Sequence, residues 1–384
     1  MTLTCFLKEK SRSRIFANKW TKIFLLLGLI QVLLSLVFLI SIEVNAFQYT
    51  IASDTLEYET SKNDGHPYFQ GFSVDPNYKI LHVKLQVIWF ILFELWRCWL
   101  VVASLIHCSS LTVITTGIST LFSLGFVGMI YVETSKMLRS DVYIKGPLQI
   151  NLYLSIAYMV CLFVILIPTL FLVYRLFLDY GWRSYKKVGA HINVQAMYYM
   201  VNCFSLALKI DTFFEFLLMI LYTVAISLHK VDDIIPKVIS SIMAVLVLIS
   251  LVLARKAISD ESYKLMYIFI IIQSLFIAFN GFILIKSVVV SDPWFFVLFY
   301  GFTSILVAIL TIVLSIRCLL NFGKGLKQHV RWSLFGSLNT DLTTEVRTVM
   351  LDEDEEDYDN YKTDPELKRA ILNEHRLSSG ENAR

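Results

Sequence analysis

The sequence predicts an all-α, polytopic membrane protein, a bundle of about eight transmembrane helices with both termini in the cytosol. Eight apolar stretches, most of them near the length that crosses a bilayer, lie between Ile23 and Ile316. Hydrophobic residues make up 56% of the chain and charged residues 17%, against about 25% charged in soluble domains. A soluble helical protein is disfavoured because its helices would be shorter and amphipathic. Runs such as 268–279 do not alternate as β-barrel strands do.

The length of each stretch supports its assignment as a transmembrane helix, because a bilayer core of roughly 30 Å needs about 20 apolar residues in a helix. Seven stretches approximate that length: 23–42, 85–106, 111–132, 150–172, 238–254, 265–285 and 294–316. The eighth, 196–228, has 33 residues and would be about 50 Å long as a helix. It has to tilt, protrude or break.

The basic residues set the expected orientation. Residues 1–22 form a basic segment, so the first helix is interpreted as a retained anchor with a cytosolic start. Seventeen Lys and Arg residues then fall in cytosolic segments and eight on the other side, with the loop 133–148 as the weak point. The transmembrane domain is expected over 23–316, with the largest lumenal loop at 43–79.

Two segments follow the last helix. Residues 317–340 are interpreted as a juxtamembrane segment, either along the cytosolic headgroups or continuing into the cytosol. Residues 341–384 hold 13 acidic and 6 basic side chains, a net charge of −7. Such a tail is expected to be largely disordered and cytosolic. It is usually only solvated, but it is also available to trafficking proteins.

Ionisable residues within two of the stretches are the candidate functional residues. An ionised side chain at the bilayer centre costs roughly 2.5 to 3.5 kcal/mol on insertion scales. Glu94 and Arg97 lie near the expected midplane, and their i, i+3 spacing allows an ion pair on one helix face. The simplest interpretation of this pair is an internal salt bridge that neutralises both charges.

The long stretch contributes Lys209, Asp211 and Glu215 to the same predicted intramembrane charge network. Lys209 can extend toward the interface, whereas Asp211 and Glu215 share a face and repel unless a proton or a cation intervenes. Two positive and three negative charges leave one carboxylate uncompensated. We therefore expect Glu215 to be protonated or bound to a cation or partner.

Catalytic and cofactor motifs are absent from the sequence. No nucleophile elbow, zinc-binding His-Glu-x-x-His or phosphate-binding glycine loop occurs. The six cysteines form no Cys-x-x-Cys pair. We expect no enzyme activity, no metal, no cofactor and no nucleic-acid partner, and we expect the lipid bilayer to be the main surrounding.

A cytosolic loop and the helix after it carry a family resemblance. The loop contains Gly181-Trp182, Tyr185-Lys186 and Gly189-Ala190, and the helix contains Met197-Tyr198 and Lys209-Ile210-Asp211 followed by aromatic residues. This pattern resembles an uncharacterised fungal family of multi-pass Golgi apparatus membrane proteins (UPF0658-like). Where many members have an acidic residue after Gly-Ala, this sequence has His191. The resemblance implies a Golgi membrane location and supplies no activity.

The same loop suits a membrane interface on physical grounds. Trp182 and Tyr185 are residues that anchor at headgroup level, and Lys186 would face anionic cytosolic lipid. We interpret the set Gly181, Trp182, Tyr185, Lys186 and Gly189 as a cytosolic interface motif.

Two functions fit this sequence. The first is a Golgi-resident protein of structural or trafficking type, with a buried charge network. The alternative is a proton- or cation-coupled transporter that uses the midplane carboxylates. An intramembrane enzyme ranks third. A cavity that reaches Glu94 and Glu215 would favour the transporter, and a closed interior would favour the structural role.

Overall fold

A computed structural model describes residues 18–64, 76–140, 145–188, 192–228, 234–289 and 294–322. Within these ranges the chain forms eight long helices and no strand. The first four are α2 (Lys19–Asp64), α3 (Pro76–His107), α4 (Ser110–Ser140) and α5 (Lys145–Val188). The others are α6 (Ile192–Leu228), α7 (Ile234–Ser259), α8 (Tyr263–Val289) and α9 (Phe295–Leu319).

Seven of these helices are long and apolar enough to cross a membrane. The exception is α6, which carries Lys209, Asp211 and Glu215 in its middle and packs among the other helices. Large apolar side chains cover the outer faces; on α2, for example, Leu33, Val37 and Phe47 are each 59 to 65% exposed. Soluble proteins rarely expose apolar surface on this scale. The prediction of an all-α multi-pass membrane protein is confirmed.

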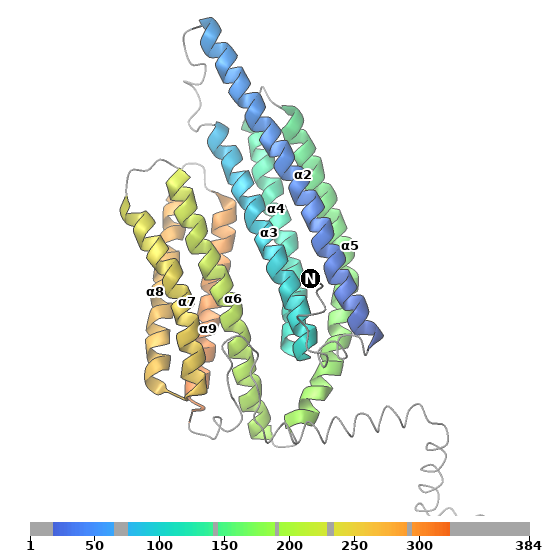
Figure 1. Ribbon diagram of the computed structural model, residues 1–384, viewed down its shortest axis with the longest axis vertical. Coiled ribbons are helices and arrows are strands. Elements are labelled where there is room, and N and C mark those ends of the chain that lie inside the picture. The colour runs from blue at the N-terminus through green and yellow to red at the C-terminus, as the bar shows by residue number, and fades with distance from the viewer. Residues whose placement is uncertain are drawn as a thin grey trace, which may run out of the picture. The chain divides into compact units, whose positions relative to one another are not determined.

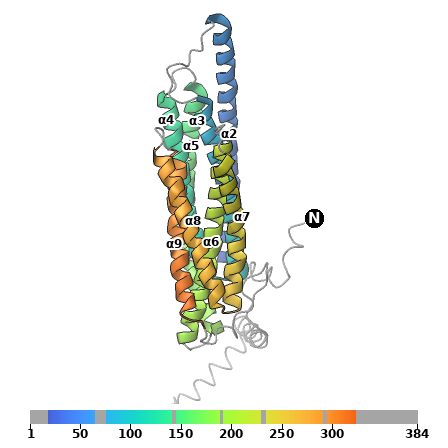
Figure 2. The same ribbon diagram turned by 90° about the vertical axis from the view of Figure 1, so that its left-hand side faces the viewer.

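The helices form two neighbouring groups of four with roughly parallel axes (Figures 1 and 2). In the first group α2 packs on α3, α3 on α4, α4 on α5 and α5 back on α2, which makes a closed four-helix bundle. In the second group α9 packs on both α6 and α8. A hydrogen bond of 2.7 Å between the hydroxyls of Thr223 and Ser240 joins α6 to α7.

Aromatic side chains join the two groups where α3 and α4 meet α6 and α9. Trp96 stacks on Phe213 with ring centroids 4.3 Å apart, and Phe214 lies 4.9 Å from Tyr300. Phe126 contacts Phe93 of α3 and Phe296, Phe299 and Tyr300 of α9. These rings form one continuous buried cluster, which we call the aromatic seam. Each such ring pair contributes about 0.5 to 1.5 kcal/mol beyond its burial.

Helix ends differ from the predicted membrane boundaries. The predicted lumenal segment 43–79 is helical at both ends, because α2 continues to Asp64 and α3 already begins at Pro76. Apolarity marks where hydrocarbon ends, whereas a helix continues until a residue breaks it. No Gly or Pro occurs between Gly28 and Gly65, so nothing in the sequence stops α2 earlier.

The extended ends pack against one another. Ala46 and Tyr49 of α2 form a small core with Ile80 and Val83 of α3 and Met137 of α4. Lys84 Nζ donates to Thr50 Oγ1 at 2.7 Å, which ties α3 to α2 in the same region. The loop predicted at 133–148 is likewise helical to Ser140. The first bundle is therefore longer than its apolar stretches.

Outside the described ranges lie nearly all of the basic segment 1–22, most of the juxtamembrane segment 317–340 and the whole acidic tail 341–384. The predictions for those segments stay predictions.

Gly301 lies where α9 packs against Leu284 of α8 and allows a test of this packing. A Cβ atom built on Gly301 would lie 2.8 Å from Leu284 Cδ2, whereas a Cβ on Gly281 would meet no atom within 4 Å. We expect Gly301→Ala to lower the thermal midpoint of the purified protein, because Leu284 has to leave its place. Gly281→Ala should raise the midpoint or leave it unchanged, since Ala is favoured over Gly in helices by about 1 kcal/mol. Equal effects of the two variants would contradict the close contact.

Candidate functional site

The first polar centre is an ion pair within α3. Arg97 Nε donates to Glu94 Oε2 at 2.8 Å, and the two side chains are 1% and 0% exposed. Ser123 of α4 donates its hydroxyl hydrogen to Glu94 Oε1. Glu94 thus accepts from a neighbouring helix as well as from its own. Because the partners are three residues apart, the pairing needs only a regular helix.

The second polar centre joins α6 to α8 through a glutamine. Gln273 of α8 donates through Nε2 to Asp211 Oδ2 at 2.5 Å and to Glu215 Oε1 at 2.7 Å. Asp211 and Glu215 are each 1% exposed. One amide group therefore connects the two carboxyl groups that α6 presents one turn apart.

Lys209 lies outside this centre. It makes no ion pair with any residue that the structure describes, and the charge that acts on it is the positive Arg255 of α7. The five residues of the predicted network therefore separate into the Glu94–Arg97 pair, the Asp211–Glu215 pair and a lone lysine. No ion pair or hydrogen bond between the described atoms connects the first pair to the second.

Sequence reasoning missed Gln273. It is one of the few polar residues inside the apolar stretch 265–285, together with Ser274 and Asn280, and it is 1% exposed. Its position in the middle of a lipid-crossing helix was a usable signal, because amide side chains in membrane helices bond across helices. Its partner lies 62 residues earlier in the chain, which no local spacing reveals.

The interface motif is only partly described. Gly181 and Trp182 lie near the end of α5, and Trp182 is 61% exposed. Tyr185 and Lys186 have helical backbone in the same helix. Gly189 lies outside the described residues. An exposed tryptophan at a helix end is compatible with anchoring at the lipid headgroups.

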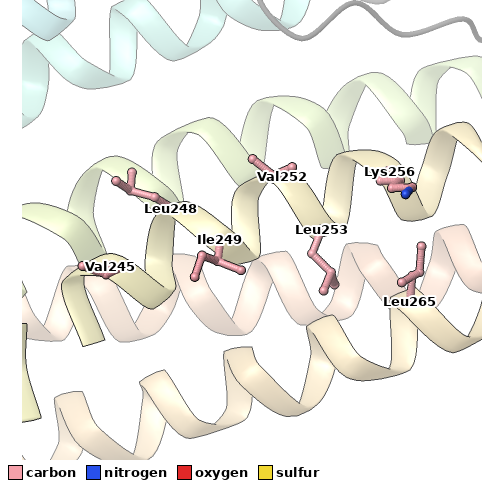
Figure 3. A pocket seen from close by; sticks show the side chains of 7 residues that line it. All are labelled: Val245, Leu248, Ile249, Val252, Leu253, Lys256 and Leu265. Atoms are coloured by element: carbon pink, nitrogen blue, oxygen red, sulfur yellow. The ribbon is translucent and has the colours of Figure 1, made fainter. Parts of the chain in front are cut away.

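An apolar groove lies on the outer face of α7 and α8. Its volume is about 460 Å³, and Lys256 is its only charged lining residue. The other lining residues are Val245, Leu248, Ile249, Val252, Leu253 and Leu265. Figure 3 shows six of these side chains along α7 and Leu265 on α8, with Lys256 toward one end. Such a surface suits lipid acyl chains.

A second, much smaller cavity lies inside the first bundle and is lined in part by Arg97. Glu94, Asp211 and Glu215 line neither cavity. No group of three or more His, Cys, Asp or Glu side chains within the described ranges is placed to hold a metal ion. The arrangement suits polar contacts that hold helices together.

Comparison with known proteins gives one informative match. The chain is 24% identical over 168 residues to a UPF0658 Golgi apparatus membrane protein of Schizosaccharomyces pombe. The aligned part is 41% of this chain and 46% of that relative, so the chain spans less than half the length of the relative that it matches. No family model matches the chain, and no solved structure matches it. The resemblance to this family of Golgi membrane proteins, predicted from the motifs, is confirmed.

Proposed function

We propose that this chain is a multi-pass protein of the Golgi membrane with a structural or trafficking role and no enzymatic activity. Its buried polar centres act as contacts that fix the order and the rotation of the helices. The observation that carries this proposal is the closure of the interior: Glu94, Asp211 and Glu215 are each 0 to 1% exposed and each bonds to a side chain of another helix. The name of the relative supports the Golgi location.

The orientation and the tail complete the proposal. Both termini face the cytosol, as the distribution of basic residues favours. The acidic tail, with a net charge of −7, is then accessible to trafficking proteins on the cytosolic side.

Localisation and orientation are tested together. A fluorescent fusion expressed in a fungal cell should coincide with Golgi markers. Protease added to intact Golgi vesicles should remove epitope tags from both termini while leaving the eight helices in the membrane. A fusion that matures normally but lies in another organelle, or a tag protected until detergent is added, would contradict the corresponding part of the proposal.

A second candidate function is proton- or cation-coupled transport, and one observation favours it. Asp211 and Glu215 share a single amide donor and have no cationic partner among the described residues. Asp211 Oδ1 is also buried without a hydrogen-bond partner there. Two negative charges so close in a medium of low dielectric are unfavourable, so a proton or a cation would accompany the pair.

Glu215→Gln distinguishes the two functions. It keeps the size of the side chain and an oxygen that accepts from Gln273 while removing the charge. In liposomes loaded with a pH-sensitive dye, a transporter should move protons in response to an imposed gradient, and the variant should stop this at unchanged protein yield. For the structural role, wild type and variant should both be silent, and the variant should reach the Golgi with equal or higher thermal stability. Proton movement that Glu215→Gln abolishes would reject the structural role as the main function.

A further inference from the structure

A small polar cavity lies among all four helices of the first bundle. Its volume is about 10 Å³, which is close to the room that one water molecule needs. Its polar lining comes from every helix of that bundle: Gln31 of α2, Arg97 of α3, Thr116 and Thr120 of α4, and Thr169 of α5. The remaining lining residues are apolar or glycine.

Two hydrogen-bond donors on this lining lack an acceptor. Arg97 bonds to Glu94 through Nε, but its Nη2 is buried and has no hydrogen-bond partner among the described residues. Gln31 Nε2 is buried and without a described partner as well, and both side chains are only 1% exposed. A buried donor left unsatisfied costs about 1 to 3 kcal/mol, and more when it is charged. Both donors therefore require an acceptor, which a molecule in the cavity that their residues line would supply.

Three threonines on the lining offer acceptors and no free donors. Thr116 Oγ1 donates to Val113 O at 2.6 Å, and Thr120 Oγ1 donates to Thr116 O at 3.0 Å. Thr169 Oγ1 donates to Ile165 O at 2.8 Å. With each hydroxyl hydrogen engaged by its own helix, the lone pairs of the oxygen atoms remain available.

We propose that one water molecule binds in this cavity and joins α2 to the Glu94–Arg97 pair. Its oxygen accepts from Arg97 Nη2 and Gln31 Nε2, and its hydrogens go to threonine oxygens. A buried water typically makes about three hydrogen bonds to otherwise unsatisfied groups. A halide ion fits less well, because it offers nothing to the threonine oxygens and adds a charge beside an ion pair that is already neutral.

The direct test is a structure of the full chain in lipid nanodiscs, at a resolution that shows ordered water, in chloride and in bromide buffers. We expect one density peak within hydrogen-bond distance of Arg97 Nη2 and Gln31 Nε2, unchanged between the buffers. An unoccupied cavity, a peak that strengthens in bromide, or Arg97 Nη2 bonded directly to a protein group would each overturn the proposal.

Gln31→Met provides an independent measurement. It keeps the length of the side chain and removes the donor, so we expect the peak to disappear and the thermal midpoint to fall. The control is Gln86→Met, because Gln86 is also fully buried with an unpartnered amide but does not line this cavity. That variant should leave the peak in place. An unchanged peak in Gln31→Met would mean that Gln31 does not hold the water and would overturn the proposed link to α2.

Discussion

Replacing Arg97 alone by leucine should prevent most of the protein from folding, whereas replacing Glu94 and Arg97 together by leucine should restore it. Removing one partner of a buried ion pair leaves an uncompensated charge and costs about 3 to 5 kcal/mol, while replacing both partners by apolar residues is often neutral. Glu94 is the residue left behind, and it is 0% exposed in the middle of α3. The measurement is the monodisperse fraction and the thermal midpoint of detergent extracts in size-exclusion chromatography.

A second i, i+3 pair on the same bundle provides the control. Glu133 and Lys136 of α4 lie 3.8 Å apart, and the lysine side chain is 32% exposed. Ion pairs that are accessible to water contribute about 0 to 1 kcal/mol, so Lys136→Leu should have a small effect. If the effects of the two single substitutions at Glu94 and Arg97 simply add in the double variant, the pair is not coupled and the interpretation is wrong.

Water bound beside Arg97 would make the recovery of the double variant incomplete. Arg97→Leu removes the donor that would bind the proposed water molecule. The amide of Gln31 would then stay without a hydrogen-bond partner. Adding Gln31→Leu to the double variant should then recover further stability.

The helices were predictable from the sequence because their signal is local. Each crossing needs a run of apolar residues, and seven of the eight described helices contain such a run. The ends were not predictable from apolarity, because it reports the thickness of hydrocarbon and not the length of a helix. Tyr49 and Ile80 show the difference: both are buried beyond the predicted membrane edge, in a core that only the packed bundle creates.

In the candidate site, too, contacts within one helix were predictable and contacts between helices were not. The Glu94–Arg97 pair was predictable because both partners lie on one helix at a spacing that brings them together. The association of Asp211 and Glu215 with Gln273 depends on how α6 packs near α8, and a sequence read in order contains no measure of that packing. Charge counting also suggested a role for Lys209, but Lys209 is two residues before Asp211, and side chains at that spacing do not face each other on a helix. The neighbouring charge that acts on Lys209 is the positive charge of Arg255.

Gln273→Leu should be the most damaging single substitution in the second group of helices. Gln273 is the donor to both carboxyl groups of α6, and its loss would leave Asp211 and Glu215 without these two hydrogen bonds. Because buried groups that lose a charge-assisted hydrogen bond pay their full desolvation penalty, we expect a loss of about 3 kcal/mol or more. The variant should show a much lower thermal midpoint and retention before the Golgi.

A rescue and a control make this test specific. Asp211→Asn, added to Gln273→Leu, supplies an amide donor to Glu215 from within α6 at i, i+4, so it should recover part of the loss. Asn280→Leu on the same helix removes a single neutral hydrogen bond, from Nδ2 to Ser304 Oγ at 3.2 Å, and such bonds between membrane helices contribute about 0.6 kcal/mol on average. A Gln273→Leu effect no larger than that of Asn280→Leu would show that the carboxyl groups do not need the glutamine. Asp211→Asn restores a hydrogen-bond donor but not the packing of the glutamine side chain. Recovery by this substitution would therefore show that Gln273 stabilises the protein by donating hydrogen bonds to the carboxyl groups.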